Sequence, residues 1–332
     1  MKRTFSESLC ELPDLRSEVL KLLAQVPVGQ VTTYGDLARA LGDEKTASAR
    51  WLGAFFKDHD HQHGCTCHRV VRSNGEIGMY VTGDPNEKAG LLKKDGVMLT
   101  GLGNVDLACR FSDFHSVKPL KQLKEFQFTL AKRRQRKSQE LTPRTFAGVD
   151  CAYRDDGNAV GAYVELDSET LAVTFEESVV APVEFPYIPG FLSFREMPVL
   201  LLLLDKVRRR RDLADIIFVD GNGILHPRRA GIATCLGVLI NRPTLGIGKS
   251  LLCGSVDTKR MRAGDIRPVY DNGELIGNAL KTKNQSKPIF ASPGNLISLE
   301  EATLFAKATM TKHRTPEPIF YADRFTKQLR KN

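Results

Sequence analysis

The sequence predicts two domains, a mainly helical one that contains a helix-turn-helix and then an α/β one. At 332 residues the chain is long enough for two ordinary cores. In its first third the apolar residues follow helical spacing, whereas from Phe146 apolar strands alternate with helical stretches. A segment rich in Gly, Ser and Asp, 100–118, separates the two patterns. We therefore expect domains at 1–105 and 118–332, with a linker at 106–117.

Three helices are expected in the first domain. Apolar residues recur at helical spacing in 12–29, which Pro27 and Gly29 end. A second short helix lies in 32–42, where Thr32 or Thr33 can cap the start and Gly42 ends it, and a third follows in 46–58. Two short helices joined by a turn containing glycine are typical of a helix-turn-helix.

The second domain is expected to begin with a basic amphipathic helix at 118–137. Strands and helices then alternate, which predicts a sheet with functional residues at strand ends. The expected strands are 146–153, 161–166, 171–180, 215–221 and 243–248, and the expected helices are 193–211, 228–240 and 298–313.

The composition is that of a soluble globular protein, with 42% hydrophobic and 26% charged residues. The run VLLLLL at 199–204 is far shorter than the roughly 20 apolar residues of a membrane span, and the N-terminus lacks an apolar signal core. Seven scattered cysteines form no disulfide framework. We expect a cytoplasmic protein with reduced thiols, which does not bind a membrane.

The positive charge is placed unevenly. The first 100 residues contain 13 basic and 13 acidic side chains, so the formal net charge of +9 belongs to the rest of the chain. Residues 110–145 alone have ten basic and three acidic side chains. Such a cluster is either a solvated surface or a nucleic-acid contact, and charge by itself does not decide between them.

The stretch HDHQHGCTCHRVV, 59–71, places three histidines and two cysteines at every second position. In an extended segment this row spans too far for one tetrahedral metal site, and its spacing matches no pair of the C-x₂₋₄-C and H-x₃₋₅-H kind. The row is therefore a solvated loop or, less in keeping with the spacing, a metal site. Cys67 is different, because His68 and Arg69 follow it directly and a neighbouring imidazole or cation can lower a thiol pKa.

The surroundings of Cys67 make a nucleophile the better interpretation. The blocks VPVGQVTTYGDLARALG, ARWLGAFF, CHRVVRSNGEIGMY and KAGLLKKDGV occur in order. Over about 13–98 they resemble the active-site domain of O6-alkylguanine-DNA alkyltransferases. The resemblance implies irreversible transfer of the O6-alkyl group to Cys67, without a cofactor.

The same resemblance implies roles for five more residues. His68 takes the thiol proton through water, and Asp95, where the family usually has Glu, orients His68. Tyr34 rotates the nucleotide out of the duplex, and Arg50 fills the gap that the nucleotide leaves. Tyr80 lines the pocket that receives the base. The chain departs from the family pattern at Thr66, His59, Val81 and Thr82. We therefore expect an active transferase with an altered range of alkyl groups.

Three acids stand at strand or helix starts of the second domain: Asp150, Glu196 and Asp220. With Lys249 after a fourth strand, they suggest a metal-dependent phosphodiesterase. The blocks FAGVDCAY, PYIPGFLSFRE, VDGNGILHPRRAGIA, PTLGIGKSLL, GNALKTK, SPGN and PEPIFYAD resemble endonuclease V, the deoxyinosine-directed nuclease, over about 118–325. The resemblance implies a ribonuclease H-like fold.

By that resemblance the three acids hold Mg²⁺, or Mn²⁺ in its place, for cleavage one nucleotide 3′ of the lesion. His226 and Lys249 stabilise charge on the phosphate or the leaving oxygen. A wedge of Tyr187 with Pro186, Ile188 and Pro189 separates the strands. The hypoxanthine pocket is framed by Gly190, Gly221, Gly231 and Ile232.

Three histidines that are usual in the second family are replaced, by Asn222, Cys235 and Asn295. Asparagine cannot carry a proton near neutral pH, so catalysis is expected to be slower. We expect a monomeric, bifunctional repair protein acting on double-stranded DNA that contains O6-alkylguanine or deoxyinosine. Two alternatives remain: a lesion-recognition protein whose nuclease domain does not cut, and a nuclease acting on inosine in RNA.

Overall fold

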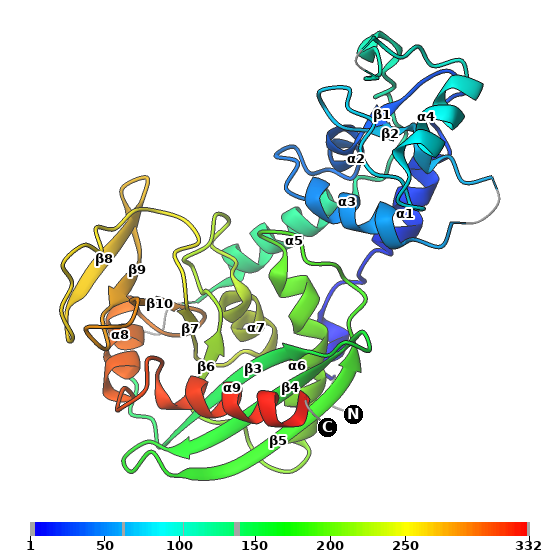
Figure 1. Cartoon of the computed structure of the whole chain (residues 1–332). Coiled ribbons are helices and arrows are strands. Elements are labelled where there is room, and N and C mark those ends of the chain that lie inside the picture. The colour runs from blue at the N-terminus through cyan, green and yellow to red at the C-terminus, as the bar shows by residue number, and fades with distance from the viewer. Residues whose placement is uncertain (1–3, 62–63, 102, 136–139, 331–332) are drawn as a thin grey trace. The chain divides into compact units, whose positions relative to one another are not determined.

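The computed structural model describes residues 4–61, 64–101, 103–135 and 140–330 (Figure 1). The chain forms two compact units. The smaller unit contains 12–125 and 185–189, and the larger unit contains the rest of the chain. The two-domain organisation expected from the sequence is therefore confirmed.

The units differ from the expected ranges at 106–117 and 1–11, and also at 118–125 and 185–189, which belong to the smaller unit and not to the second domain. The segment 106–117 is packed into the smaller unit: Val31 N donates to Cys109 O at 3.1 Å, and Phe111 N donates to Val31 O at 2.7 Å. The N-terminal segment belongs to the larger unit, where the amides of Phe5 and Ser6 donate to the Asp205 carboxylate at 2.9 and 3.1 Å. Composition suggested a linker, but these long-range hydrogen bonds tie both segments down.

Four helices surround a two-stranded parallel sheet in the smaller unit. Its elements are α1 (Leu15–Leu23), β1 (Thr32–Thr33), α2 (Tyr34–Ala40), α3 (Ala49–Asp58), the 3-10 turn η2 (Cys67–Arg69), β2 (Val70–Val71), α4 (Pro85–Lys94), the 3-10 turn η3 (Leu107–Cys109) and the first part of α5 (Pro119–Arg133).

A capping box begins α2, in which Thr33 Oγ1 accepts from the Asp36 amide and the Asp36 carboxylate accepts from the Thr33 amide. Arg39 and Arg110 pair with the same carboxylate, which is 3% exposed. Helix α3 follows α2 after a short connection and packs against it. The expected pair of short helices is therefore present.

An eight-stranded mixed sheet in the order β5-β4-β3-β6-β7-β10-β9-β8 forms the centre of the larger unit. The central strands β3, β6 and β7 run parallel, and the other pairs are antiparallel. The strands are β3 (Thr145–Tyr153), β4 (Asn158–Asp167), β5 (Val173–Pro182), β6 (Ile216–Asp220), β7 (Thr244–Gly248), β8 (Ile266–Asp271), β9 (Glu274–Leu280) and β10 (Ile289–Pro293).

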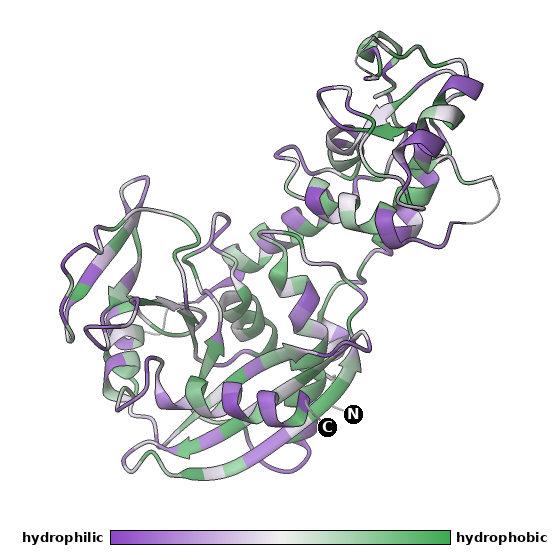
Figure 2. Ribbon diagram, viewed as in Figure 1, coloured by the Kyte–Doolittle hydropathy of each residue, from purple (hydrophilic) through white to green (hydrophobic). Residues whose placement is uncertain are grey.

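Helices cover both faces of this sheet. They are α6 (Leu192–Arg208), α7 (Ile232–Ile240), α8 (Leu299–Ala308) and α9 (Glu317–Arg330). Gly161 of β4 faces Val199 of α6, whereas Gly148 of β3 faces Pro318 of α9, on the opposite face. A Cβ at Gly148 would lie 1.9 Å from the Pro318 carbonyl oxygen, so only glycine permits this approach. Figure 2 shows hydrophobic residues along the central strands and α7, and alternating hydrophilic and hydrophobic bands along α9.

Three strands, β8 to β10, were not expected from the sequence. β8 and β9 form a hairpin whose turn contains Asn272 and Gly273 with φ of 53° and 82°. An Asn-Gly pair between apolar stretches is a strong hairpin signal, so this turn was predictable. Among the described residues, no helix combines the length and the apolar character needed to cross a membrane.

Candidate active sites

Cys67 begins the turn η2, which leads directly into β2, and its side chain is buried. β2 pairs in parallel with β1, with Thr33 opposite Val71. This pairing places the start of α2, at Tyr34, beside the end of β2. The short β2 therefore connects the turn that carries Cys67 to the start of α2.

Asp95 ends α4 and holds the two residues that follow Cys67. Its Oδ2 lies 2.9 Å from His68 Nε2 and accepts from Arg69 Nε at 2.6 Å. Burial acts to raise the pKa of Asp95, but the hydrogen bonds from Arg69 and His68 outweigh it and lower the pKa. The ionised carboxylate fixes the proton of His68 on Nε2. The other ring nitrogen, Nδ1, is buried without a partner among the described residues and is left as an acceptor.

The other side chains predicted for this site fall into two groups. Tyr34 is half-buried and lies edge-to-face with Phe56, with 6.2 Å between ring centroids, and Tyr80 is buried. The Tyr80 hydroxyl lies 3.1 Å from His61 Nε2, and the other ring nitrogen of His61 lies 3.5 Å from Cys67 Sγ. Burial raises the pKa of Tyr80. Arg50 is exposed in the first turn of α3. The structure thus links Tyr80 to Cys67 through His61, packs Tyr34 against Phe56 and leaves Arg50 at the surface.

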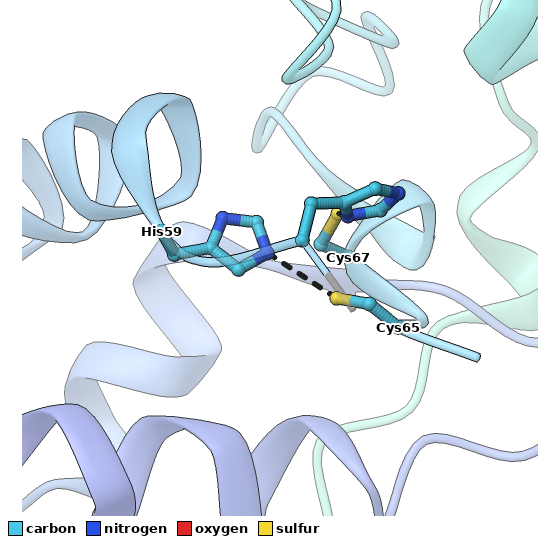
Figure 3. Close-up of side chains that lie close together, drawn as sticks. His59, Cys65 and Cys67 are labelled. Atoms are coloured by element: carbon cyan, nitrogen blue, oxygen red, sulfur yellow. Dashed lines mark hydrogen bonds between the residues drawn. The ribbon is translucent and has the colours of Figure 1, made fainter. Parts of the chain in front are cut away.

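The row of histidines and cysteines is not extended. Ligand atoms of His59, His61, Cys65 and Cys67 all lie within 4.8 Å of one another. Gly64, just before Cys65, has φ of 92°, which is not the backbone of an extended strand. Figure 3 shows His59, Cys65 and Cys67 close together. The expectation that this row spans too far for one metal is therefore wrong for four of its five members. His63 lies outside the described residues.

The thiols of Cys65 and Cys67 influence each other. The hydrogen bond from Cys67 lowers the pKa of Cys65, and His59 adds to this effect, while burial opposes it. The hydrogen bond to Cys65 raises the pKa of Cys67, together with burial. The two thiols therefore titrate as a pair, and the buried Cys67 needs a proton acceptor to become a thiolate.

Two adjacent strands and one helix form the carboxylate cluster of the larger unit. Asp150 on β3 and Asp220 at the end of β6 are neighbours, because Val149 pairs with Val219 in the parallel register. Asp323 of α9 joins them, and the three carboxylates offer oxygens within 4.8 Å of one another. Thr326 of α9 donates to Asp150 Oδ2 at 2.9 Å. Such a set of hard oxygen donors suits a divalent cation.

Glu196 reaches the same region from α6, on the other face of the sheet. Its Oε1 accepts from the Tyr153 hydroxyl at 2.9 Å, and it does not belong to the group of three. Burial raises the pKa of Glu196 to about 8, and the charges of Asp150 and Asp220 add to this. Burial likewise raises the pKa of Asp150 to about 7, with Asp220 adding to it. A bound cation would remove this repulsion between carboxylates.

Lys249 follows β7 and bridges two of the acids. Its Nζ lies 2.5 Å from Asp220 Oδ2 and 3.6 Å from Asp323 Oδ1. Burial acts to lower the pKa of Lys249, but the charges of Asp220, Asp150 and Asp323 raise it. The ammonium group is therefore charged beside the cluster.

His226 is buried, and both its ring nitrogens meet backbone groups. Nε2 lies 3.2 Å from the Gly190 carbonyl oxygen, and Nδ1 accepts from the Arg228 amide at 3.2 Å. Burial lowers the pKa of His226 to about 3, and Arg228 adds to this. His226 is therefore a neutral imidazole that holds the Gly190 turn, to which Gln127 of α5 also donates at 3.2 Å.

Two of the glycines predicted to frame a base pocket lie where the backbone comes very close to other atoms of the larger unit. Gly221 has φ of 145°, and a Cβ there would lie 2.4 Å from the Ile232 side chain. A Cβ at Gly231 would lie 2.1 Å from the Asn222 carbonyl oxygen. Gly221, Gly231 and Ile232 are thus brought together.

In the predicted wedge Tyr187 is 61% exposed, whereas Ile188 is fully buried, so the tyrosine ring is the part that projects.

The residues that replace the usual histidines lie inside the larger unit, where two of them contact backbone carbonyl oxygens. Asn295 Nδ2 donates to Gly237 O, and its Oδ1 accepts from the Gln135 amide, both at 2.9 Å. Cys235 is fully buried in α7, and its sulfur lies 3.4 Å from Ala230 O. Asn222 Oδ1 is buried without a partner among the described residues. Asn295 therefore serves packing between α7, β10 and the end of α5.

Sequence reasoning missed Asp323, Tyr153 and Thr326. Asp323 and Tyr153 end two of the quoted blocks, PEPIFYAD and FAGVDCAY. The signal that could have found Asp323 is its spacing from Thr326, which places both residues on one face of α9.

Two family models match the chain. The model of endonuclease V matches residues 127–324, and that of the 6-O-methylguanine DNA methyltransferase, DNA binding domain, matches residues 14–97. The chain is similar to the bifunctional methyltransferase/endonuclease of Picrophilus torridus along almost all of both proteins. The identity is 35% over 320 residues, which cover 96% of this chain and 98% of the relative.

Solved endonuclease V structures are similar to about two thirds of the chain. The catalytic domain of human endonuclease V is 30% identical with a TM-score of 0.61, covering 65% of this chain and 98% of that one. The enzyme of Ciona intestinalis, solved with a 24mer DNA containing an inosine followed by a ribo-adenosine, is 25% identical. Its TM-score is 0.58, and the match covers 64% of this chain and 98% of that one.

Proposed function

The chain belongs to the family of bifunctional methyltransferase/endonucleases and, through residues 127–324, to that of endonuclease V, and from this premise we propose two repair reactions on DNA. The smaller unit accepts an alkyl group from O6-alkylguanine at Cys67. The larger unit cleaves one strand one nucleotide 3′ of deoxyinosine, with a divalent cation. The substrate is double-stranded DNA, and the protein acts as a monomer.

The observation that supports alkyl transfer is the fixed tautomer of His68. With its Nε2 proton held at Asp95, the Nδ1 lone pair takes the Cys67 thiol proton through a water molecule. The sulfur then bonds to the alkyl carbon as the bond from this carbon to O6 breaks, and the proton returns to guanine. Tyr80 and Tyr34 border the flipped base, and exposed Arg50 fills its place in the duplex.

Alkyl transfer is tested by incubating the protein with DNA containing O6-methylguanine and mapping the adduct by peptide mass spectrometry. We expect one methyl group per chain on Cys67 and none in Cys67→Ser. The control is Cys109→Ser, which removes another thiol of the smaller unit and should react normally. A methyl group on another cysteine, or none, would remove this assignment.

The observation that supports cleavage is the cluster of Asp150, Asp220 and Asp323. We assign Mg²⁺, with Mn²⁺ as a substitute, to Asp150 and Asp220, with Glu196 as the third acid and Asp323 as a further candidate ligand. When bound, the ion activates water and neutralises charge on the phosphate. Lys249 adds positive charge at the scissile phosphate, and His226 fixes the turn that carries Gly190.

The other residues predicted from the sequence bind the nucleic acid. Exposed Tyr187 forms the wedge, anchored by Pro186, Ile188 and Pro189. The hypoxanthine pocket is framed by Gly190, Gly221, Gly231 and Ile232. Lys132 and Arg133 of α5 line a polar surface pocket of about 600 Å³, where they neutralise DNA phosphates. We also assign this unit to the ribonuclease H-like folds, because two of its carboxylates, Asp150 and Asp220, stand on adjacent central strands of a mixed sheet.

Cleavage is tested with a 5′-labelled deoxyinosine duplex and a matched RNA, each with Mg²⁺ and with a chelator. We expect a Mg²⁺-dependent DNA cut one nucleotide 3′ of inosine, lost in Asp220→Ala while the duplex is still bound. Binding without any cut would favour the recognition module suggested by Asn222, Cys235 and Asn295. Cleavage of RNA alone would replace the DNA substrate.

A further inference from the structure

The side chains of His59, His61, Cys65 and Cys67 gather at one place, and the alkyl transfer proposed above uses only Cys67. Figure 3 shows three of them, His59, Cys65 and Cys67. His59 Nε2 lies 3.2 Å from Cys65 Sγ, and His61 Nδ1 lies 3.5 Å from Cys67 Sγ. In a tetrahedral zinc site with ordinary bond lengths, neighbouring ligand atoms are about 3.3 to 3.8 Å apart. The two measured pairs are near this spacing, and the remaining pairs are within 4.8 Å. A small inward shift of the side chains would complete the tetrahedron.

The donor set selects the kind of cation. Two thiolates and two imidazoles are soft to borderline ligands, which suit Zn²⁺ and not Mg²⁺ or Ca²⁺. When the ion binds, two S–H protons pass to the buffer and two S–Zn bonds form. Two thiolates and two neutral imidazoles balance the charge of the ion, so the buried complex carries no net charge.

Further contacts favour an ion at this place. The Tyr80 hydroxyl lies 3.1 Å from His61 Nε2, which leaves Nδ1 directed at Cys67, and such a partner on the second ring nitrogen is usual for histidines that bind metals. A surface pocket of about 510 Å³ is lined by the C-terminal part of α1 and by the segment after α3, which includes His59 and Cys65. This pocket gives a hydrated cation a path to the sulfur atoms.

We propose that His59, His61, Cys65 and Cys67 form a tetrahedral zinc site that holds the sulfur of Cys67. A zinc-bound sulfur shares its lone pair with the ion and, in a complex without net charge, is a weaker nucleophile than the free thiolate. Zinc therefore protects Cys67 from alkylating and oxidising compounds. The inference that zinc binding competes with alkyl transfer at Cys67 rests on the proposed function, whereas the metal site itself does not.

The site is tested first with Co²⁺, added to the reduced, metal-free full chain. We expect one Co²⁺ per chain with thiolate-to-cobalt charge-transfer absorption, which ions bound to carboxylates of the larger unit cannot produce. Zn²⁺ should displace it. Cys65→Ser and His61→Ala should lose or strongly weaken the absorption, whereas Cys109→Ser and His115→Ala, outside the cluster, should keep it. Far-UV circular dichroism and Trp51 fluorescence verify that each variant is folded.

The second test measures how fast iodoacetamide labels each cysteine, by peptide mass spectrometry. Zn²⁺ should slow labelling of Cys67 at least tenfold, a chelator should restore it, and Cys109 should not respond. These results do not depend on DNA or on repair activity. The proposal is overturned by the absence of charge-transfer absorption, by equal labelling of Cys67 with and without Zn²⁺, or by a Cys65–Cys67 disulfide that persists under reductant.

Discussion

His68 Nε2 lies 2.9 Å from Asp95 Oδ2, across 27 residues of sequence, and this contact decides which nitrogen of His68 is free. Arg69 donates to the same oxygen, so the carboxylate is held from two sides. The acid that directs the base is therefore itself fixed in position, as a catalytic hydrogen-bond chain requires.

Asp95→Asn should slow alkyl transfer about 10- to 100-fold, because an amide can donate to Nε2 and stabilise the wrong tautomer. Single-turnover transfer from DNA containing O6-methylguanine measures this rate. Asp95→Glu should recover most of it, since a carboxylate is restored. As a control, Glu76→Gln removes an exposed ion pair with Arg72 and should react at the normal rate. A normal rate in Asp95→Asn would exclude the tautomer role.

Asp36 should make the smaller unit sensitive to acid. Burial acts to raise the pKa of Asp36, but the hydrogen bonds from Arg110, Thr33 and Arg39 lower it to about 2. A carboxyl whose pKa is lower in the folded than in the unfolded state stabilises the folded protein at pH values above its ordinary pKa. This stabilisation is lost as the pH falls towards 2.

Asp36→Asn should therefore lower the free energy of unfolding at pH 7 by about 2 kcal/mol, and the difference from the native protein should vanish near pH 2. Urea unfolding followed by fluorescence of Trp51, the single tryptophan, reports on α3 of this unit. The exposed Asp113→Asn serves as the control. A difference that stays constant down to pH 2 would contradict the assignment of this stability to ionised Asp36.

Gly148→Ala should weaken the larger unit by about 3 kcal/mol, because the new methyl group collides with the Pro318 carbonyl oxygen and forces α9 away from β3. Thermal unfolding followed by far-UV circular dichroism measures the loss. Gly90→Ala, where an added Cβ meets open space, should leave the stability nearly unchanged or raise it slightly. Should Gly148→Ala melt like the native protein, the tight approach of α9 would be refuted.

Asp323→Asn should reduce Mg²⁺-dependent cleavage about 10- to 100-fold, because one of the three clustered carboxylates loses its charge beside Lys249. The measurement is the cleavage rate of the deoxyinosine duplex as Mg²⁺ is varied. If Asp323 contributes to holding the ion, more Mg²⁺ should recover part of the rate. Asp212→Asn, at an exposed acid of the same unit, should cleave normally. An undiminished rate in Asp323→Asn would show that the third acid is Glu196 alone.

Local sequence was sufficient for features that depend on neighbouring residues. The Thr33 cap before α2, the order Cys67-His68-Arg69 and the acids on two apolar strands were all readable from the sequence, because turns, caps and periodicity act over a few residues. The β8–β9 hairpin was equally readable from its Asn-Gly turn and was missed.

Tertiary structure decided which distant residues meet. Asp323 joins Asp150 only because Gly148 lets α9 approach β3, and Asp205 binds the N-terminal segment about 200 residues away. The turn at Gly64 converts an apparent row of separate ligands into a cluster that includes Cys67. The residue types available for two reactions follow from the sequence alone, because short-range preferences are encoded locally. Their assembly depended on close packing between elements, and no local pattern contains that information.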